Sequence, residues 1–316
     1  LILSKATVFF FFIILINIFS SLIFDQHKNS NISNLIIKPG MNLEEISREL
    51  FSKKIIKNPD IFKIWVKLSF SEKKLRFGEF IFEKSNSIYD VTEKLINGDV
   101  FFRKLTIIEG SYKYELLNIL KEIDPQSSLE YHDIGDLIIA DTYSYQITDS
   151  AERILNDIKK ISNNFSRKIW SKRDLTIPIK SINEMFILAS IVEKETSIKI
   201  EKPLISGVFY NRLNKNMRLQ SDPTVIYAIT EGKYKLKRNL TRKDLKFKSV
   251  YNTYVRKGLP PSIIGFPGKD SLLSATLPKK SDLLYFVAKN EGGEHYFSSN
   301  YKQHLKNIKA SKDEKK

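Results

Sequence analysis

The sequence predicts an α+β protein with an N-terminal transmembrane helix, a small α/β subdomain and a larger, mixed α+β domain. Three observations predict this class. The chain opens with one long uncharged apolar segment, helical periodicity alternates with short strand-like runs after residue 34, and 316 residues exceed one average domain. At 42% apolar and 28% charged residues, the composition is that of a folded protein and excludes collagen and wholesale disorder.

The residue counts also exclude several kinds of site. Cysteine is absent, which excludes disulfide frameworks, thiolate zinc sites and cysteine nucleophiles. The four histidines stand at spacings unlike any metal motif, so we expect no metal and no cofactor.

Residues 6–24 form the apolar segment, in which Asn17 is the only strongly polar side chain. About 20 such residues span a hydrocarbon core of roughly 30 Å, so we expect an uncleaved anchor. The alternative is a cleaved secretory signal, but Ser20 and Ser21 followed by Leu22 make a poor cleavage site. Lys5 and Lys28 flank the segment and barely decide its orientation.

Residues 34–104 read as strand, turn, two helices, strand and helix. Pro39-Gly40 forms the first turn, Asn42 is placed to cap the first helix, Asn58-Pro59 begins the second, and Ser87 caps the third. The expected strands cover 35–38 and 77–82. A strand, glycine turn and helix in this order resembles a LysM-like glycan-binding unit, so we predict a LysM-like and linking subdomain here.

Residues 105–308 form the predicted larger domain. A strand over 101–108 and a helix over 112–120 repeat the strand, glycine turn and helix order. The periodicity then predicts helices over 150–170, 181–196, 203–213 and 221–229, and a buried strand over 283–287. The basic residues 309–316 are expected to form a disordered tail.

Two carboxylates end the apolar helix 181–196. At about 100° per residue, Glu193 and Glu195 point roughly 200° apart and cannot both face the same solvent. A glutamate beside a cleft at this end would have a raised pKa, which suits a general acid. The alternative is a helix end that exposes Glu193, Lys194 and Glu195 to water.

Loop motifs rich in amides and aromatic rings follow this helix. Such side chains stack on sugars and bind their hydroxyl and acetamido groups. Six motifs in order, at residues 189–196, 208–213, 219–227, 251–254, 258–261 and 284–288, resemble the membrane-anchored endolytic murein transglycosylase family.

The resemblance implies a lyase that cuts nascent peptidoglycan strands between N-acetylmuramic acid (MurNAc) and N-acetylglucosamine (GlcNAc), limiting their length. One carboxyl group would protonate the leaving oxygen and then accept the proton of the muramoyl C6 hydroxyl, leaving a 1,6-anhydro end. Glu195-Thr196 parallels the Glu-Ser pair that ends the catalytic helix of other lytic transglycosylases. This parallel favours Glu195 as the acid/base, while Glu193 would orient its neighbour or pair with a cation such as Arg212.

The resemblance also implies which side chains line the cleft. These are Asn211, Gln220, Ser221, Asp222, Thr224, Tyr227, Asn252 and Tyr254. Two have simpler alternatives, because Asp222 could only cap its helix and Tyr227 could only pack.

The chain departs from the family pattern over residues 135–143, where the Glu-Gly order is lost and Ala140 replaces a proline. Ser262 and Ile263 are further departures. A catalytically inactive, peptidoglycan-binding scaffold of the same fold therefore stays as the alternative function.

The formal net charge of +16 is compatible with nucleic acid binding. Residues 233–257 carry ten basic side chains and one acidic side chain, that of Asp244. A membrane tether with the body outside the cytoplasm makes nucleic acid inaccessible, so we expect no nucleic acid partner. The resemblance instead implies peptidoglycan glycan strands and peptidoglycan synthases as partners. It also implies a single-pass protein of the bacterial cytoplasmic (inner) membrane with its catalytic body on the extracytoplasmic side. Stem-peptide carboxylates and anionic lipid headgroups are the acidic groups available there.

Overall fold

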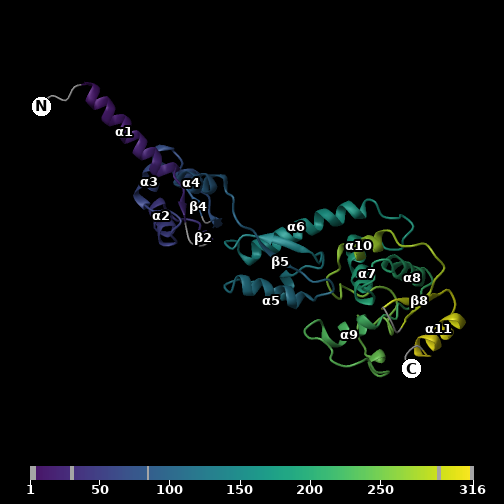
Figure 1. The fold of residues 1–316 in the computed structure, drawn as a ribbon. Helices are drawn as coiled ribbons and strands as arrows, with labels where there is room; N and C mark the ends of the chain where they lie inside the picture. Colours follow the sequence, from purple (N-terminus) through teal and green to yellow (C-terminus); the bar gives the residue numbers. More distant parts are fainter. Residues whose placement is uncertain (1–4, 29–31, 84, 290–292, 314–316) are drawn as a thin grey trace. The chain divides into compact units, whose positions relative to one another are not determined.

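The computed structural model describes residues 5–28, 32–83, 85–289 and 293–313 (Figure 1). The fold is mixed α+β, as predicted. The chain forms two compact units, one from the residues up to 104 together with 144–149, and one from 105–143 together with 150 onward. We describe each unit by itself.

Helix α1 (Lys5–Phe24) is long and apolar enough to cross a membrane. Its window Thr7–Phe24 has a mean hydropathy of 2.5, and only 6% of that window is buried. The last turn differs, because Ile23 is buried and the ring of Phe24 lies 5.9 Å from that of Trp65 and 5.2 Å from that of Tyr89. The end of α1 is therefore built into the first unit.

The first unit is an antiparallel strand pair covered by helices. Strand β2 (Ser33–Ile37) pairs with β3 (Gly78–Phe82). Helices α2 (Leu43–Ser52) and α3 (Pro59–Leu68) join these strands, and α4 (Ile88–Asn97) follows. The unit also holds the short pair β1 (His27–Lys28) and β4 (Ser85–Asn86) and the 3₁₀ turn η1 (Glu72–Lys74).

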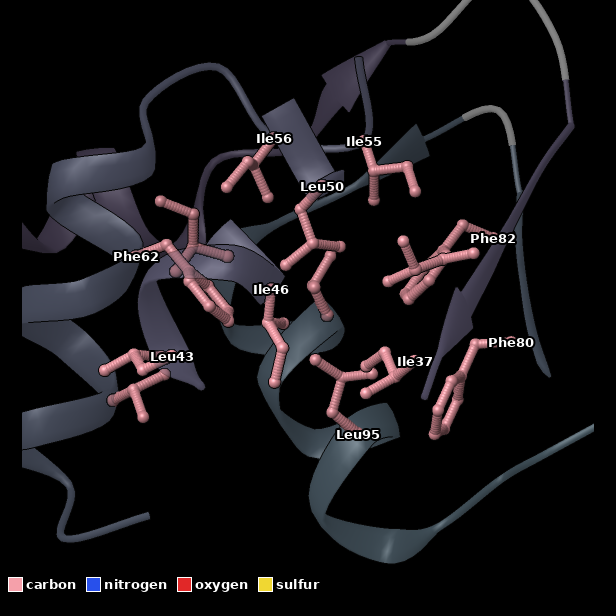
Figure 2. Close-up of a cluster of buried hydrophobic side chains, with 14 residues drawn as sticks. Ile37, Leu43, Ile46, Leu50, Ile55, Ile56, Phe62, Phe80, Phe82 and Leu95 are labelled. Carbon is pink, nitrogen blue, oxygen red and sulfur yellow. The ribbon is translucent and has the colours of Figure 1, made fainter. Parts of the chain in front are cut away.

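Alternating apolar residues build the core of the first unit. Leu35 and Ile37 of β2 lie on the same side of the strand pair as Phe80 and Phe82 of β3. Figure 2 shows Ile37, Phe80 and Phe82 packed with residues of the helices. The predicted cap at Asn42 is present as a capping box, since its side chain accepts from the Glu45 N–H and the Glu45 carboxylate accepts from the Asn42 N–H.

The second unit contains the longer helices. They are α5 (Lys113–Ile123), α6 (Ala151–Trp170), α7 (Ile182–Glu195), α8 (Lys202–Asn214), α9 (Asp222–Thr230), α10 (Lys269–Thr276) and α11 (Tyr301–Asp313). Strand β7 (Tyr285–Ala288) pairs antiparallel with β8 (His295–Ser298). The paired strands β5 (Arg103–Thr106) and β6 (Thr142–Tyr145) belong to neither unit alone, because the division of the chain falls within both of them. The 3₁₀ turns η2 (Tyr131–Asp133) and η3 (Asp244–Lys246) complete the description.

Helix α7 is the core helix of this unit. Every residue from Met185 to Val192 is buried, because α6, α8, α9 and α10 all pack against the helix. Its charged residues lie at its two ends, so Glu193 and Glu195 follow directly after the run of buried apolar residues.

Two predicted segments differ in the structure. The predicted buried strand 283–287 begins at Tyr285 and is only half-buried, because β7 lies in a two-stranded hairpin covered by α11. The predicted disordered tail is helical over residues 309–313, which belong to α11, and 314–316 lie outside the described residues.

Candidate active site

Glu195, the residue predicted to be the acid/base, is the last residue of α7. Its side chain accepts a hydrogen bond from the Ser221 hydroxyl. Burial of the carboxyl group raises the pKa of Glu195 to about 7, and the charge of Asp222 adds to this rise, while Ser221 and Arg212 oppose it. The residue as a whole is half-buried.

Ser221 is held by contacts with Thr253 and Thr224, of which the sequence motifs predicted only Thr224 as a site residue. It is the N-cap residue of α9, but its hydroxyl is not used for capping and is free to bond Glu195. Its backbone N–H donates to Thr253 Oγ1 at 3.0 Å, and that oxygen lies 2.8 Å from Thr224 Oγ1. Thr253 was missed by sequence reasoning, although it stands inside the quoted motif between Asn252 and Tyr254.

Asp222 and Tyr254 form a polar pair next to Ser221. The Tyr254 hydroxyl donates to Asp222 Oδ1 at 2.6 Å, and burial together with this contact raises the pKa of Tyr254. Asp222 is the first helical residue of α9 rather than its cap, so the capping alternative is wrong. Gln220 is exposed in the same loop with a φ of 50°, in the left-handed region.

Arg212 supplies a buried positive charge that acts on Glu195. Its guanidinium donates to the backbone carbonyls of Leu284, at 2.7 Å, and Leu219, at 2.5 Å. Its Cζ also lies 5.4 Å from the centre of the Tyr285 ring. These contacts hold Arg212 in place.

Glu193 has a different set of partners from Glu195, as the angular separation predicts. Its carboxylate pairs with Lys202 Nζ at 2.8 Å, and their side chains are only 4% and 2% exposed. It also accepts from the N–H of Gly268 at 2.9 Å and from the Ser271 hydroxyl at 2.7 Å, at the start of α10.

The expected pairing of Glu193 with Arg212 is therefore corrected to Lys202. Lys202 begins α8, close to the end of α7, whereas Arg212 lies ten residues further along α8, or about 15 Å along its axis. Glu193 thus joins α7, α8 and α10.

Three of the residues predicted to line the cleft form hydrogen bonds within the protein. Asn252 is fully buried, and its Nδ2 donates to the carbonyls of Leu245 and Phe247 at 3.2 and 2.8 Å. Asn211 Nδ2 donates to two carbonyls of the segment 281–283. The Thr224 hydroxyl is buried and donates to the Ser221 carbonyl at 2.6 Å. These side chains shape the loops and leave their donors no room for a ligand.

Tyr227 lines a pocket of about 360 Å³, which we call the tyrosine pocket. The other rings in its wall are Tyr114, Tyr131 and Tyr251. Tyr227 and Tyr251 have ring centres 4.8 Å apart, and those of Tyr114 and Tyr131 are 4.3 Å apart. Such rings offer apolar faces of the kind on which sugars stack.

Residues 135–143, which depart from the family pattern, pack against the residues that precede α10. Ala140 is buried and forms a parallel bridge with Gly268, with its N–H donating to the Pro267 carbonyl at 2.9 Å. This segment therefore supports the start of α10, where Glu193 is held. Within the described ranges, no group of three His, Asp or Glu side chains could hold a metal ion.

A sequence model of the YceG-like family matches residues 35–310, which include every residue of this site. The chain belongs to the YceG-like family. Relatives in this family include a Bacillus subtilis protein named endolytic murein transglycosylase, 28% identical over 306 residues that cover 86% of this chain and 83% of that protein.

A Streptococcus pneumoniae protein of the same name is 27% identical over 320 residues, which cover 86% of this chain and 57% of the relative. The chain thus spans a little over half of that protein. The crystal structure of a YceG-like protein from Listeria monocytogenes superposes with a TM-score of 0.51 and 29% identity, covering 89% of this chain and 99% of that chain.

Proposed function

We propose that this chain is an endolytic lytic transglycosylase, which cleaves nascent peptidoglycan between MurNAc and GlcNAc and leaves 1,6-anhydroMurNAc ends that limit strand length. The observation that carries this proposal is the carboxyl group of Glu195. It holds a proton near neutral pH, contacts Ser221 and stands at the end of a rigid buried helix. Two relatives whose names carry this activity support the assignment.

The mechanism needs one carboxyl group in two roles. Protonated Glu195 gives its proton to the glycosidic oxygen, and the bond from that oxygen to the muramoyl anomeric carbon breaks. The C6 hydroxyl oxygen then bonds to the anomeric carbon, and its proton passes to the Glu195 carboxylate. The Ser221 hydrogen bond and the charge of Arg212 stabilise this carboxylate between the two transfers, since both lower the pKa of Glu195.

The test compares the full chain with its Glu195→Gln variant on uncross-linked glycan strands, with products identified by mass spectrometry. We expect anhydro-ended products from the unmodified chain and a rate lower by about 10²–10⁴-fold in the variant, because a general acid contributes about that factor. Glu122→Gln, at an exposed site on α5, is the matched control.

Two results would contradict the proposal. Reducing ends, one water heavier than anhydro ends, would identify a hydrolase, and no cleavage by the unmodified chain would favour the inactive scaffold.

We further propose that α1 anchors the chain in the bacterial cytoplasmic membrane with its body on the extracytoplasmic side, where it meets glycan strands and peptidoglycan synthases. The length and hydropathy of α1 support an anchor. The order β2, α2, α3, β3 with an antiparallel strand pair supports a LysM-like role in glycan binding for the first unit.

A further inference from the structure

A second pocket of the second unit carries both signs of charge, and we call it the charged pocket. It has a volume of about 330 Å³. The residues that line it include two acidic ones, Glu109 and Glu115, and two lysines, Lys194 and Lys235. Ile226 and Leu236 add apolar surface between them.

Lys194 is the central group of this pocket. Its Nζ lies 4.1 Å from the centre of the Tyr112 ring. The aliphatic part of its side chain runs past two glycines. A Cβ added at Gly110 would lie 3.5 Å from Lys194 Cδ, and one added at Gly265 would lie 2.9 Å from Lys194 Cε. The glycines therefore leave room for this side chain, and larger residues at Gly265 would displace it.

The charge of Lys194 lacks a close counter-ion. Over the described part of the chain, Lys194 forms no ion pair within 4.0 Å. Burial lowers the pKa of Lys194, and the more distant charge of Glu115 partly opposes this change. An anionic group of a ligand would stabilise the positive charge of this amine, which burial destabilises.

The acidic residues restrict what that ligand can be. Glu115 Oε2 accepts from the Tyr112 N–H at 2.7 Å, which fixes it in the wall. The Glu109 carboxylate lies at the start of α10, since a Cβ added at Gly268 would lie 2.0 Å from its Oε1, so Glu115 is the carboxylate whose charge acts on Lys194. A polyanion such as a diphosphate would face Glu115, and a purely cationic ligand would face both lysines. A short peptide with a free carboxylate and a free ammonium can pair with the lysines and with Glu115.

We propose that the charged pocket binds the peptide stem of the glycan strand, with a stem carboxylate at Lys194 and Lys235 and a stem ammonium toward Glu115. This proposal rests on the proposed function. It fits the substrate because the stem is attached to the muramoyl residue whose bond Glu195 cleaves, and Lys194 and Glu195 are consecutive residues of α7. Helix α9 also joins the two places, since Ser221 directly precedes its first residue and Ile226 lines the pocket.

The experiment measures kcat/KM of the full chain on glycan strands with intact stems and on the same strands stripped of stems by an amidase. The quantity compared is the ratio of the two values. We expect Lys194→Met and Lys235→Met each to lower this ratio about tenfold, because each removes one hydrogen bond to a charged group. Lys237→Met, an exposed lysine of the same basic segment, is the matched control and should keep the ratio.

Failure of this proposal is distinguishable from failure of the proposed function. Anhydro products from stripped strands test the function without the pocket. If those products form and the ratio for Lys235→Met equals that of the unmodified chain, the stem site is overturned, even where Lys194→Met fails to fold. A free stem tripeptide that ends in a diamino acid should inhibit cleavage, and equal inhibition by inorganic diphosphate would overturn the assignment to a peptide.

Discussion

Glu195 differs from Glu193 in its surroundings, although both are glutamates at the end of one helix. The Glu193 carboxylate contacts an amine, a backbone N–H and a hydroxyl. Glu195 meets one hydroxyl and the negative charge of Asp222, and burial raises its pKa to about 7. The two carboxyl groups therefore differ in the number of donors that they contact, and the surroundings of Glu195 favour its protonated form.

This difference predicts the pH dependence of the reaction. Because the acid must be protonated, kcat/KM should fall above about pH 7, by about tenfold per pH unit. The Ser221 hydrogen bond lowers the pKa of Glu195, so Ser221→Ala should raise that pKa and move the alkaline limb to higher pH. Ser197→Ala, at an exposed site, should leave the limb in place. A limb that stays fixed or moves to lower pH in Ser221→Ala would contradict the assignment.

For these residues, the sequence predicted the relative directions of the side chains better than it predicted the residues that they contact. The angular separation of Glu193 and Glu195 followed from helix geometry alone. The partners Lys202 and Thr253 depend on how α8 and the 252–254 loop approach α7 and α9, which no local pattern specifies.

The junction of α7, α8 and α10 depends on one buried ion pair. Gly268 begins α10 without a side-chain cap, and Glu193 supplies the missing acceptor. A Cβ at Gly268 would lie 2.0 Å from Glu109 Oε1, so a larger residue there would require the Glu109 side chain to move. Three helices therefore share a single carboxylate as their common contact.

Removing the amine alone should strongly destabilise the second unit. Lys202→Met leaves Glu193 buried without its partner, which we expect to cost about 3–5 kcal/mol of unfolding free energy. The double variant Glu193→Gln with Lys202→Met removes both charges and should recover most of that loss. Urea unfolding measures all the variants, and a double variant less stable than Lys202→Met would contradict the argument.

Helices with a side-chain cap could be predicted from the sequence. The predicted caps at Asn42 and Ser87 are present, and the helices predicted to start at residues 150 and 181 have the side chains of Ser150 and Ser181 as their caps. Helix α10 was missed because its acceptor comes from Glu193, about 75 residues earlier in the chain. Helix α11 was not predicted, and its residues from 309 onward were expected to belong to a disordered tail because the lysines there are typical of solvated chain.

On the scale of the whole molecule, the chain crosses between its two units more than once. The segment 144–149 belongs to the first unit although the residues on both sides of it belong to the second. Gln146 reaches within 3.3 Å of the position of a Cβ at Gly78. Periodicity and caps describe single elements, so this return of the chain could not be predicted from the sequence.

Two compact units predict two unfolding transitions in calorimetry of the full chain in detergent. Gly78→Ala should lower only the transition of the first unit, because Gly78 has a φ of 140° and its added Cβ would lie 2.5 Å from Val100 Cγ1. Lys202→Met should lower only the other transition. A single transition that both variants shift equally would contradict independent units.

The packing of Ile23 and Phe24 against the first unit has a mechanical consequence for α1. A helix joined to its domain by a loose linker can rotate and tilt alone, but here Trp65 and Tyr89 hold the ring that ends the apolar span. Any tilt or rotation of α1 at this end must therefore turn the β2–β3 unit by the same angle.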